Sequence, residues 1–347
     1  MTLLNCIERI PSKLEEIWEN KEERFEKLRI YLENETIEEV VFIASGTSYN
    51  SAFTTKSFFE KMGIKTSFIY PNIFVNYTQI LNKKALYVMI SQGGETKLVY
   101  ESLKKVQIKG CKNCSITANL NCIIAREADV SILMGCDYEE YLYRTIGYST
   151  TVGTCFMLAL NLASKQCGLN INDYENDYKK MITNLEAIKI QTLDWYKQHK
   201  FSLMRKQKMI FAGTNDLLAV AQEADIKLME MVPMMTRTFE LEEFIHGPQN
   251  SFTSDTGFFI LARASEDKEK AIAIANFLKN EIGFCCLVGD VKVDNRDLTL
   301  SIQSKHFSAL EYITTMQIIA FKMADDRGRD LSRGVNTQIS NYIKKTV

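Results

Sequence analysis

Two short segments of the sequence combine small residues with hydroxyl groups, which suits them to holding a phosphate. Residues 46–50 read Gly-Thr-Ser-Tyr-Asn, and residues 91–96 read Ser-Gln-Gly-Gly-Glu-Thr. Each segment follows an apolar run and precedes a helical pattern, so each offers free backbone N–H groups at the start of a helix, where anions bind. Neither matches the phosphate loop GxxxxGK followed by Ser or Thr, nor the GxGxxG pattern of dinucleotide-binding folds.

The same segments also allow a purely structural interpretation. Ser48 and Thr96 could be helix caps, because a serine or threonine hydroxyl accepts a hydrogen bond from the free N–H groups of a helix's first turn. Either segment alone favours capping. Ligands of open parallel sheets, however, bind at the carboxyl ends of strands. Because both segments follow equivalent strand ends, we favour a phosphate site.

The second half of the chain contains residues that could transfer protons. Glu223 and Glu230 are seven residues apart and lie on one face of a predicted helix, and His246 is one of three histidines. A carboxylate can act as a general base, and an imidazole exchanges protons near neutral pH. A solvated acidic face for the glutamates and a capping or core role for His246 are the simpler interpretations, and the pattern by itself leaves them open.

Alternating strands and helices must position these residues. The apolar runs expected to be strands are residues 40–44, 66–70, 86–91, 114–118 and 131–135 in the first half and 209–213, 258–262, 284–289 and 298–302 in the second. Near-continuous apolar strands separated by helices predict an α/β fold with parallel sheets covered on both faces. Residues 42–48 and 210–215 both run from an apolar strand into Gly-Thr, which indicates an internal duplication.

The same pattern predicts the domain organisation. We expect an N-terminal helix within residues 1–34, formed by residues 10 to about 32, and a first domain over residues 35–168. A polar stretch and a helix would then lead to a second domain over residues 195–330. Residues 331–347 would form a C-terminal tail.

The composition excludes several classes of protein. Lysine and arginine total 42 against 43 for aspartate and glutamate, so the net charge of −1 gives no attraction to nucleic acid or to an anionic membrane. The apolar runs are short, so no transmembrane helix is expected. Glu8 and Arg9 stand where a signal peptide needs an apolar core, so we expect a cytoplasmic protein.

The nine cysteines predict free thiols in a reducing compartment. Cys111 and Cys114 form a CxxC motif, but it falls between a helix end and a strand, whereas a thioredoxin-type pair begins a helix. A zinc site needs two more ligands at close spacing, and none follows. We therefore expect structural thiols and neither a metal nor a cofactor.

Taken in order, these motifs resemble the sugar isomerase (SIS) superfamily. Residues 46–48, residues 91–96 and Glu230 followed sixteen residues later by His246 are similar to the isomerase half of glucosamine-6-phosphate synthase and to fructosamine (ketoamine) 6-phosphate deglycases. The resemblance runs over about residues 40–345. It implies two tandem SIS domains, each a flavodoxin-like three-layer sandwich around a parallel sheet, and a homodimer whose site is shared between subunits.

The resemblance also implies roles for individual residues. A sugar phosphate would be held by Gly46, Thr47, Ser48, Ser91, Gln92, Gly93 and Thr96. Glu230 would be the acid/base that acts on the C1–C2 unit of the sugar. His246 would assist ring opening or protonate the leaving group, from the neighbouring subunit. Lys345 aligns with the family's active-site lysine near the C-terminus.

Departures from the family pattern bear on the activity. Gly93 stands where the synthases have a second serine, and Gly147 where they have a lysine, so both favour the deglycase branch. The synthases' glutaminase exposes a cysteine directly after the initiator methionine, but Thr2 stands there and Cys6 lacks the context. We therefore expect that the chain does not make its own ammonia from glutamine.

The resulting expectation is an enzyme of amino-sugar metabolism that acts on an amino-sugar or ketoamine 6-phosphate and releases an amine. Two alternatives stay open: a synthase-like isomerase without a glutaminase, and a non-catalytic sugar-phosphate sensor. A sensor would need Ser48, Ser91 and Thr96 but not Glu230 and His246 together. Neither the amine nor the sugar can be read from the sequence.

Overall fold

The structure is a computed structural model that describes residues 2–136, 139–265 and 267–347. It divides into two compact units. Unit A consists of Ser12–Glu140, Ile146–Tyr174 and Gly334–Val347, and unit B of Met1–Pro11, Tyr141–Thr145 and Glu175–Arg333. Each end of the chain therefore belongs to the unit built mainly from the other half of the sequence.

Unit A is built on a five-stranded parallel sheet of order β2-β1-β3-β4-β5. The strands are β1 (Glu39–Ile43), β2 (Lys65–Ile69), β3 (Ala85–Ile90), β4 (Lys112–Thr117) and β5 (Val130–Leu133). All five overlap the strands predicted for the first half. Every residue of β1 and β3 is buried, as expected for central strands that helices cover on both faces.

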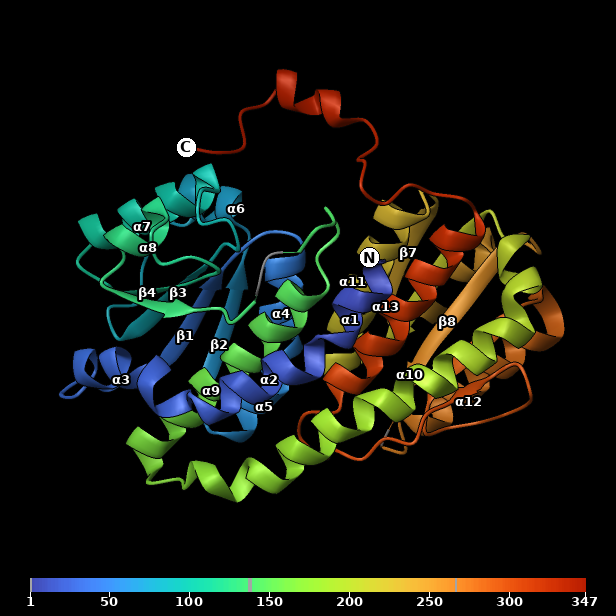
Figure 1. Cartoon of the computed structure of the whole chain (residues 1–347), viewed down its shortest axis with the longest axis horizontal. Helices are drawn as coiled ribbons and strands as arrows, with labels where there is room; N and C mark the ends of the chain where they lie inside the picture. Colours follow the sequence, from blue (N-terminus) through green and yellow to red (C-terminus); the bar gives the residue numbers. More distant parts are fainter. Residues whose placement is uncertain (1, 137–138, 266) are drawn as a thin grey trace. The chain divides into compact units, whose positions relative to one another are not determined.

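Helices flank this sheet (Figure 1). They are α2 (Ile10–Glu19), α3 (Lys21–Tyr31), α4 (Thr47–Thr54), α5 (Lys56–Lys61), α6 (Pro71–Tyr77), α7 (Lys97–Ile108), α8 (Ile123–Glu127) and α9 (Ile146–Cys167), with a 3₁₀ turn η1 (Ile171–Tyr174). The single helix expected from residue 10 to about 32 is interrupted between α2 and α3. There the Asn20 side-chain amide donates to the Glu16 carbonyl at 2.8 Å, which competes with the continuing helix.

Among the described residues, α9 is the one helix whose length and apolar composition would suffice to cross a membrane. The expectation that no segment has this character is therefore wrong on composition. Its whole apolar window is buried inside the protein, as in the core helix of a globular fold. The sequence did not indicate this apolar character because threonines and serines divide the helix into short apolar runs. The hydroxyls of Thr150 and Thr151 donate hydrogen bonds to backbone carbonyls one turn earlier in the helix.

Unit B repeats the topology of unit A. Its strands are β6 (Lys208–Gly213), β7 (Met235–Glu240), β8 (Thr256–Ala262), β9 (Cys285–Gly289) and β10 (Leu298–Thr299), all parallel in the order β10-β9-β8-β6-β7. Read from its other edge, this order is β7-β6-β8-β9-β10. It corresponds strand for strand to β2-β1-β3-β4-β5 of unit A, as a duplication requires. Strand β7 was not anticipated from the sequence, and β10 is shorter than the predicted run over residues 298–302.

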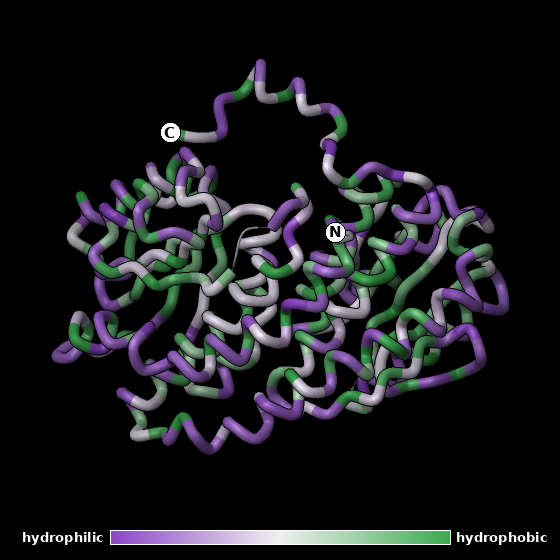
Figure 2. The backbone as a smooth tube through the Cα atoms, viewed as in Figure 1, coloured by the Kyte–Doolittle hydropathy of each residue, from purple (hydrophilic) through white to green (hydrophobic). Residues whose placement is uncertain are grey.

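The helices of unit B cover both faces of that sheet. They are α1 (Leu3–Glu8), α10 (Glu175–Met204), α11 (Asp216–Met231), α12 (Lys268–Phe277), a π turn η4 (Leu278–Ile282) and α13 (Ala309–Asp326), with 3₁₀ turns η2 (Glu243–Ile245) and η3 (Pro248–Ser251). Hydrophilic and hydrophobic positions alternate along α10 (Figure 2), whose buried side includes Met181, Leu185 and Ile188. A further 3₁₀ turn, η5 (Thr337–Asn341), lies in the tail that belongs to unit A.

Candidate functional site

The two hydroxyl-bearing segments of unit A follow neighbouring strands of its sheet. Strands β1 and β3 are parallel neighbours, so the residues that follow them leave the sheet at the same edge. Gly46 is the N-cap residue of α4 and has a positive φ of 55°, a conformation that favours glycine. Thr47 and Ser48 form the first turn of α4 and are half-buried. The expected pairing of the two segments at equivalent strand ends is therefore confirmed.

The segment at residues 91–96 is a tight loop with two hydroxyls side by side. Ser91 Oγ and Thr96 Oγ1 are 2.8 Å apart, and Ser91 Oγ also accepts the Gly94 N–H at 3.1 Å. Gly94 has a φ of 67°, and a Cβ there would lie 2.0 Å from the Cys122 sulfur, so only glycine fits. Gly93, in contrast, is exposed and faces open space.

Helix capping does not explain these hydroxyls. The N-cap of α4 is Gly46 rather than Ser48. Thr96 is the N-cap residue of α7, but its side chain makes no capping hydrogen bond. The capping interpretation is therefore wrong for both residues. What unit A presents here is a pair of adjacent hydroxyls and the first turns of two helices, which is a suitable environment for a phosphate dianion.

The C-terminal tail returns to this loop. Lys97 N–H donates to the Lys345 carbonyl at 2.9 Å, and Val347 N–H donates to the Glu95 carbonyl at 3.0 Å. Thr96 and Thr346 form an antiparallel bridge between these two bonds. Lys345 is exposed and lies directly beside the loop that carries Thr96. The tail thus brings the backbone of Lys345 to the edge of the candidate phosphate site.

In unit B, α11 carries a buried ionic cluster. The Lys227 ammonium lies 3.4 Å from a Glu223 carboxylate oxygen and 2.9 Å from a Glu230 oxygen. Glu223 and Lys227 have side chains exposed by 0% and 1%, whereas the Glu230 side chain is 42% exposed. Burial alone would lower the pKa of Lys227, but the two carboxylates outweigh it and hold that pKa above its ordinary value. A solvated acidic face is therefore excluded for Glu223.

Sequence reasoning missed Lys227. It follows Glu223 by four residues and precedes Glu230 by three, so all three share one stripe of the helix. A lysine at that spacing between two glutamates was the available signal. Its consequence is that Glu230 presents a partly accessible carboxylate whose position is fixed by a buried cation.

His246 lies at the end of η2 and is exposed, so a core role is excluded. Its ring Nε2 is 2.8 Å from the Glu242 carboxylate, which also pairs with Lys270. The pKa of Glu242 is lowered most by its hydrogen bond with Lys270 and next by its hydrogen bond with His246. In the described part of unit B the hydrogen bonds of His246 and Glu230 lead to different partners, so the structure does not join these two side chains.

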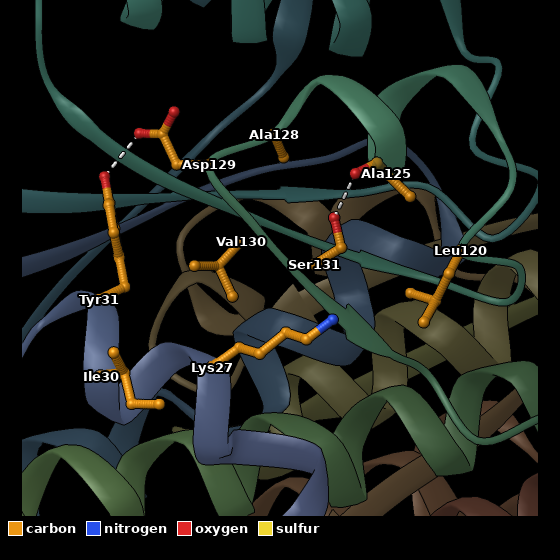
Figure 3. A pocket seen from close by; sticks show the side chains of 9 residues that line it. All are labelled: Lys27, Ile30, Tyr31, Leu120, Ala125, Ala128, Asp129, Val130 and Ser131. Carbon is orange, nitrogen blue, oxygen red and sulfur yellow. Dashed lines mark hydrogen bonds between the residues drawn. The ribbon is translucent and has the colours of Figure 1, made fainter.

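Two other features lie outside the candidate site. Cys111 and Cys114 are buried and free, and burial raises the pKa of Cys114, which makes it a poor nucleophile. A cavity of about 560 Å³ lies between α3 and the edge strand β5 (Figure 3). Three of its polar side chains are already hydrogen-bonded, since Tyr31 donates to Asp129 and Ser131 donates to the Ala125 carbonyl. It contains none of the predicted site residues.

Comparison with known proteins gives this architecture a family. Residues 36–163, which include both hydroxyl-bearing loops, match the SIS domain family. This stretch is a SIS domain. Over 248 residues the chain is 26% identical to a glutamine–fructose-6-phosphate aminotransferase (isomerizing) from Clostridium tetani. The match covers 69% of this chain and 40% of that relative, so the chain spans about half or less of the relative's length.

Solved structures with SIS-type architecture share the fold across the whole chain. A candidate phosphosugar isomerase from Clostridium difficile superimposes with a TM-score of 0.91 at 24% identity and covers 100% of this chain and 99% of its own. The C-terminal domain of a glucosamine-fructose-6-phosphate aminotransferase from Francisella tularensis gives a TM-score of 0.84 at 20% identity, covering 95% and 97%. The α/β fold with two parallel sheets is therefore one that these solved structures share.

The ionic cluster on α11 leads to a stability prediction. Lys227→Met removes the cation shared by two carboxylates, one of them fully buried, and should lower the free energy of unfolding by about 3–5 kcal/mol at neutral pH. Without the cation, buried Glu223 should take up a proton more readily. The loss of unfolding free energy relative to the wild type should therefore become smaller as the pH falls from 8 to about 5.

Urea denaturation at both pH values measures this, with exposed Lys270→Met as the matched control, expected to cost less than about 1 kcal/mol. In the wild type the pKa of Lys227 is raised in the folded state. Its contribution to the free energy of unfolding is therefore complete below the ordinary lysine pKa, and it declines only as the pH rises through the pKa of the folded state. An equal and pH-independent effect of the two variants would contradict the cluster's role.

Proposed function

We propose that the chain is a phosphosugar enzyme that moves a proton across C1–C2 of an amino-sugar or ketoamine 6-phosphate and releases the amine. The observation that carries this proposal is the arrangement on α11, where a buried lysine positions the accessible carboxylate of Glu230. Burying two charges is costly, so such a cluster indicates a chemical use rather than stability alone. Similarity to SIS phosphosugar isomerases and to an aminotransferase that acts on fructose 6-phosphate supports the sugar phosphate as ligand.

The proposed phosphate site lies at the carboxyl edge of the unit A sheet. Hydroxyls of Ser48, Ser91 and Thr96 would donate to phosphate oxygens, with Gln92 as a further donor. Backbone groups of residues 46–47 and of Gly93 would approach the same anion, because glycine lets the chain come close. Charge-assisted hydrogen bonds of this kind are the strong ones, so the phosphate would anchor the substrate while the sugar reacts.

The chemistry follows from the substrate. An amino group on C1 of a 2-keto sugar is hard to expel directly, since its departure would leave an electron-deficient C1 beside the electron-withdrawing C2 carbonyl. Removing a proton from C1 and adding one to the C2 oxygen gives a C1–C2 enaminol. Adding a proton at C2 then gives an iminium at C1, which is the protonated form of the imine. Water adds to that imine and the amine departs, leaving the aldose phosphate.

Three residues of this chain fit the roles that this route requires. Glu230 would be the base that takes the C1 proton. His246 would be the acid that protonates the departing side or opens the sugar ring, since imidazole exchanges protons near neutral pH. Lys345 would stabilise the negative charge that develops on the carbonyl oxygen. No metal or cofactor enters this route.

A second candidate activity has an observation in its favour. The chain's similarity to a glutamine–fructose-6-phosphate aminotransferase is compatible with a synthase-like isomerase, in which ammonia from outside adds to C2 of a ketose phosphate and a proton then moves from C1 to C2. Incubation with phosphoketoamines, and separately with fructose 6-phosphate and ammonia, distinguishes the two by product. Binding without turnover of either would favour a sugar-phosphate sensor.

We further propose a cytoplasmic homodimer with a shared site. The nine free cysteines support a reducing compartment. The exposure of His246, 63% for its side chain, suits a residue that completes the pocket of a neighbouring subunit.

Replacing the carboxylate of Glu230, the proposed base, tests the mechanism. Glu230→Gln keeps the size of the side chain and should retain hexose 6-phosphate binding while turnover falls by about 10²–10⁴. Steady-state kinetics together with calorimetry measures both. Exposed Glu243→Gln is the matched control and should keep wild-type turnover. A nearly active Glu230→Gln, or a collapse in Glu243→Gln instead, would assign the base elsewhere.

The phosphate site has its own test. Ser91→Ala and Thr96→Ala each remove one charge-assisted contact and should weaken hexose 6-phosphate binding by about 1.5–3 kcal/mol. Calorimetry with the unphosphorylated hexose is the control, because its affinity should not change. Unaltered hexose 6-phosphate affinity in both variants would remove these hydroxyls from the site.

A complementation experiment tests the shared site. If His246 serves the pocket of the other subunit, a Glu230→Ala chain mixed with a His246→Ala chain forms dimers in which one of the two pockets is intact. Activity should reappear after subunit exchange, although neither parent is active. No recovery despite demonstrated exchange would place His246 in the pocket of its own chain.

A further inference from the structure

A buried carboxylate lies beside the phosphate loop of unit A and was not among the expected site residues. Glu139 is 3% exposed. One of its oxygens accepts the Ile146 N–H at 2.8 Å and the other accepts the Gly147 N–H at 3.1 Å. These N–H groups belong to the first turn of α9 and have no partner within the helix, so Glu139 satisfies two of the four free donors there.

The same carboxylate also contacts the side chain of Gln92. Gln92 Nε2 donates to Glu139 Oε2 at 3.4 Å. A carboxylate accepts hydrogen bonds and does not donate them, so it selects the NH₂ end of the amide over the oxygen end. Glu139 therefore determines how the Gln92 amide is turned, as well as where it lies.

Gly147 supplies the space for this amide. A Cβ at Gly147 would lie 2.2 Å from Gln92 Oε1 and 2.7 Å from its Cδ, distances that no real contact allows. Glycine inside a helix costs about 1 kcal/mol relative to alanine, so a helical glycine calls for a packing reason. The Gln92 side chain is that reason.

The backbone of Gln92 is held independently of its side chain. Its carbonyl accepts the Ala118 N–H at 3.0 Å, and the preceding Ser91 N–H donates to the Ile116 carbonyl at 3.2 Å. With the main chain attached to the end of β4, the amide is the part of Gln92 that still has freedom to move. Glu139 and Gly147 act on that part alone.

We propose that Glu139 is a positioning residue for phosphosugar binding, and that Gly147 reserves the space in which it acts. Together they hold the Gln92 amide in the orientation that binds the sugar phosphate. This inference rests on the proposed function, in which Gln92 is a phosphate-site donor. It also gives the glycine at position 147 a physical role, because any larger residue would occupy the place of the amide.

Gly147→Ala separates positioning from helix capping, since it leaves Glu139 and both N–H donors in place and favours the helix. It should weaken binding of glucose 6-phosphate by about 5–30-fold, the cost of one lost hydrogen bond, and match Gln92→Ala. Glu139→Gln can present its own NH₂ group to the Gln92 amide and should weaken binding in the same way. It tests the positioning role independently if the Gly147→Ala protein is unstable. Ser164→Ala, on the same helix, is the control and should bind as the wild type does.

The decisive measurement is a double-mutant cycle by calorimetry. In a Gln92→Ala background, neither Gly147→Ala nor Glu139→Gln should change the dissociation constant by more than about twofold, because both act through Gln92. Effects that multiply with that of Gln92→Ala would mean that Glu139 and Gly147 do not act through Gln92 and would overturn the positioning role. Wild-type binding by Gly147→Ala and Glu139→Gln would overturn it too and leave Glu139 as a helix cap.

The outcomes also separate this inference from the proposed function. Wild-type protein that fails to bind glucose 6-phosphate overturns the proposed function and this inference with it. Binding that is unaffected by Gln92→Ala leaves phosphosugar binding intact and overturns only the positioning role.

Discussion

The parallel pairing of β1 with β3 is the constraint on which the candidate phosphate site depends. The register pairs Ile43, the last residue of β1, with Met89, one residue before the end of β3, so the residues that follow both strands leave the sheet at the same edge. Both strands are fully buried, which makes a shift in register costly because it would expose apolar side chains. The loop at residues 91–96 is then closed by Gly94 and by main-chain bonds with the tail.

The two units use one topology for different purposes. Gly46 and Asn215 occupy equivalent positions after β1 and β6 and have nearly the same backbone angles, φ 55° and ψ −134° against φ 56° and ψ −126°. Both residue types tolerate a positive φ. In unit A the turn leads into a short helix next to the hydroxyl-bearing loop. In unit B it leads into α11, whose buried face carries Lys227 and its two carboxylates, so the copies differ in helix faces rather than in sheet order.

Buried charged groups occur both where we place the chemistry and elsewhere in the fold. Lys227 is enclosed by Glu223 and Glu230, and Glu139 is enclosed by the start of α9 and Gln92. Unit B also has a buried pair, Lys279 with Asp297, whose carboxylate accepts three backbone N–H groups and so secures a loop. That pair is buried and hydrogen-bonded within the fold, whereas the Glu230 side chain is 42% exposed and accessible to a ligand. This accessibility is the physical difference between a structural and a chemical role.

The sequence by itself determined the sheet strands, the duplication, the free thiols and the residues that bear hydroxyls, because these follow from local patterns of apolar, small and polar residues. It did not reveal β7, whose Thr236, Arg237 and Thr238 lack the apolar run of a central strand because β7 is an edge strand. Nor did it reveal that Lys227 is buried, that Gln92 fills the space at Gly147, or that the tail pairs with Glu95 and Lys97. Burial and long-range main-chain bonds depend on which elements pack together, and residue type along one chain does not encode that directly.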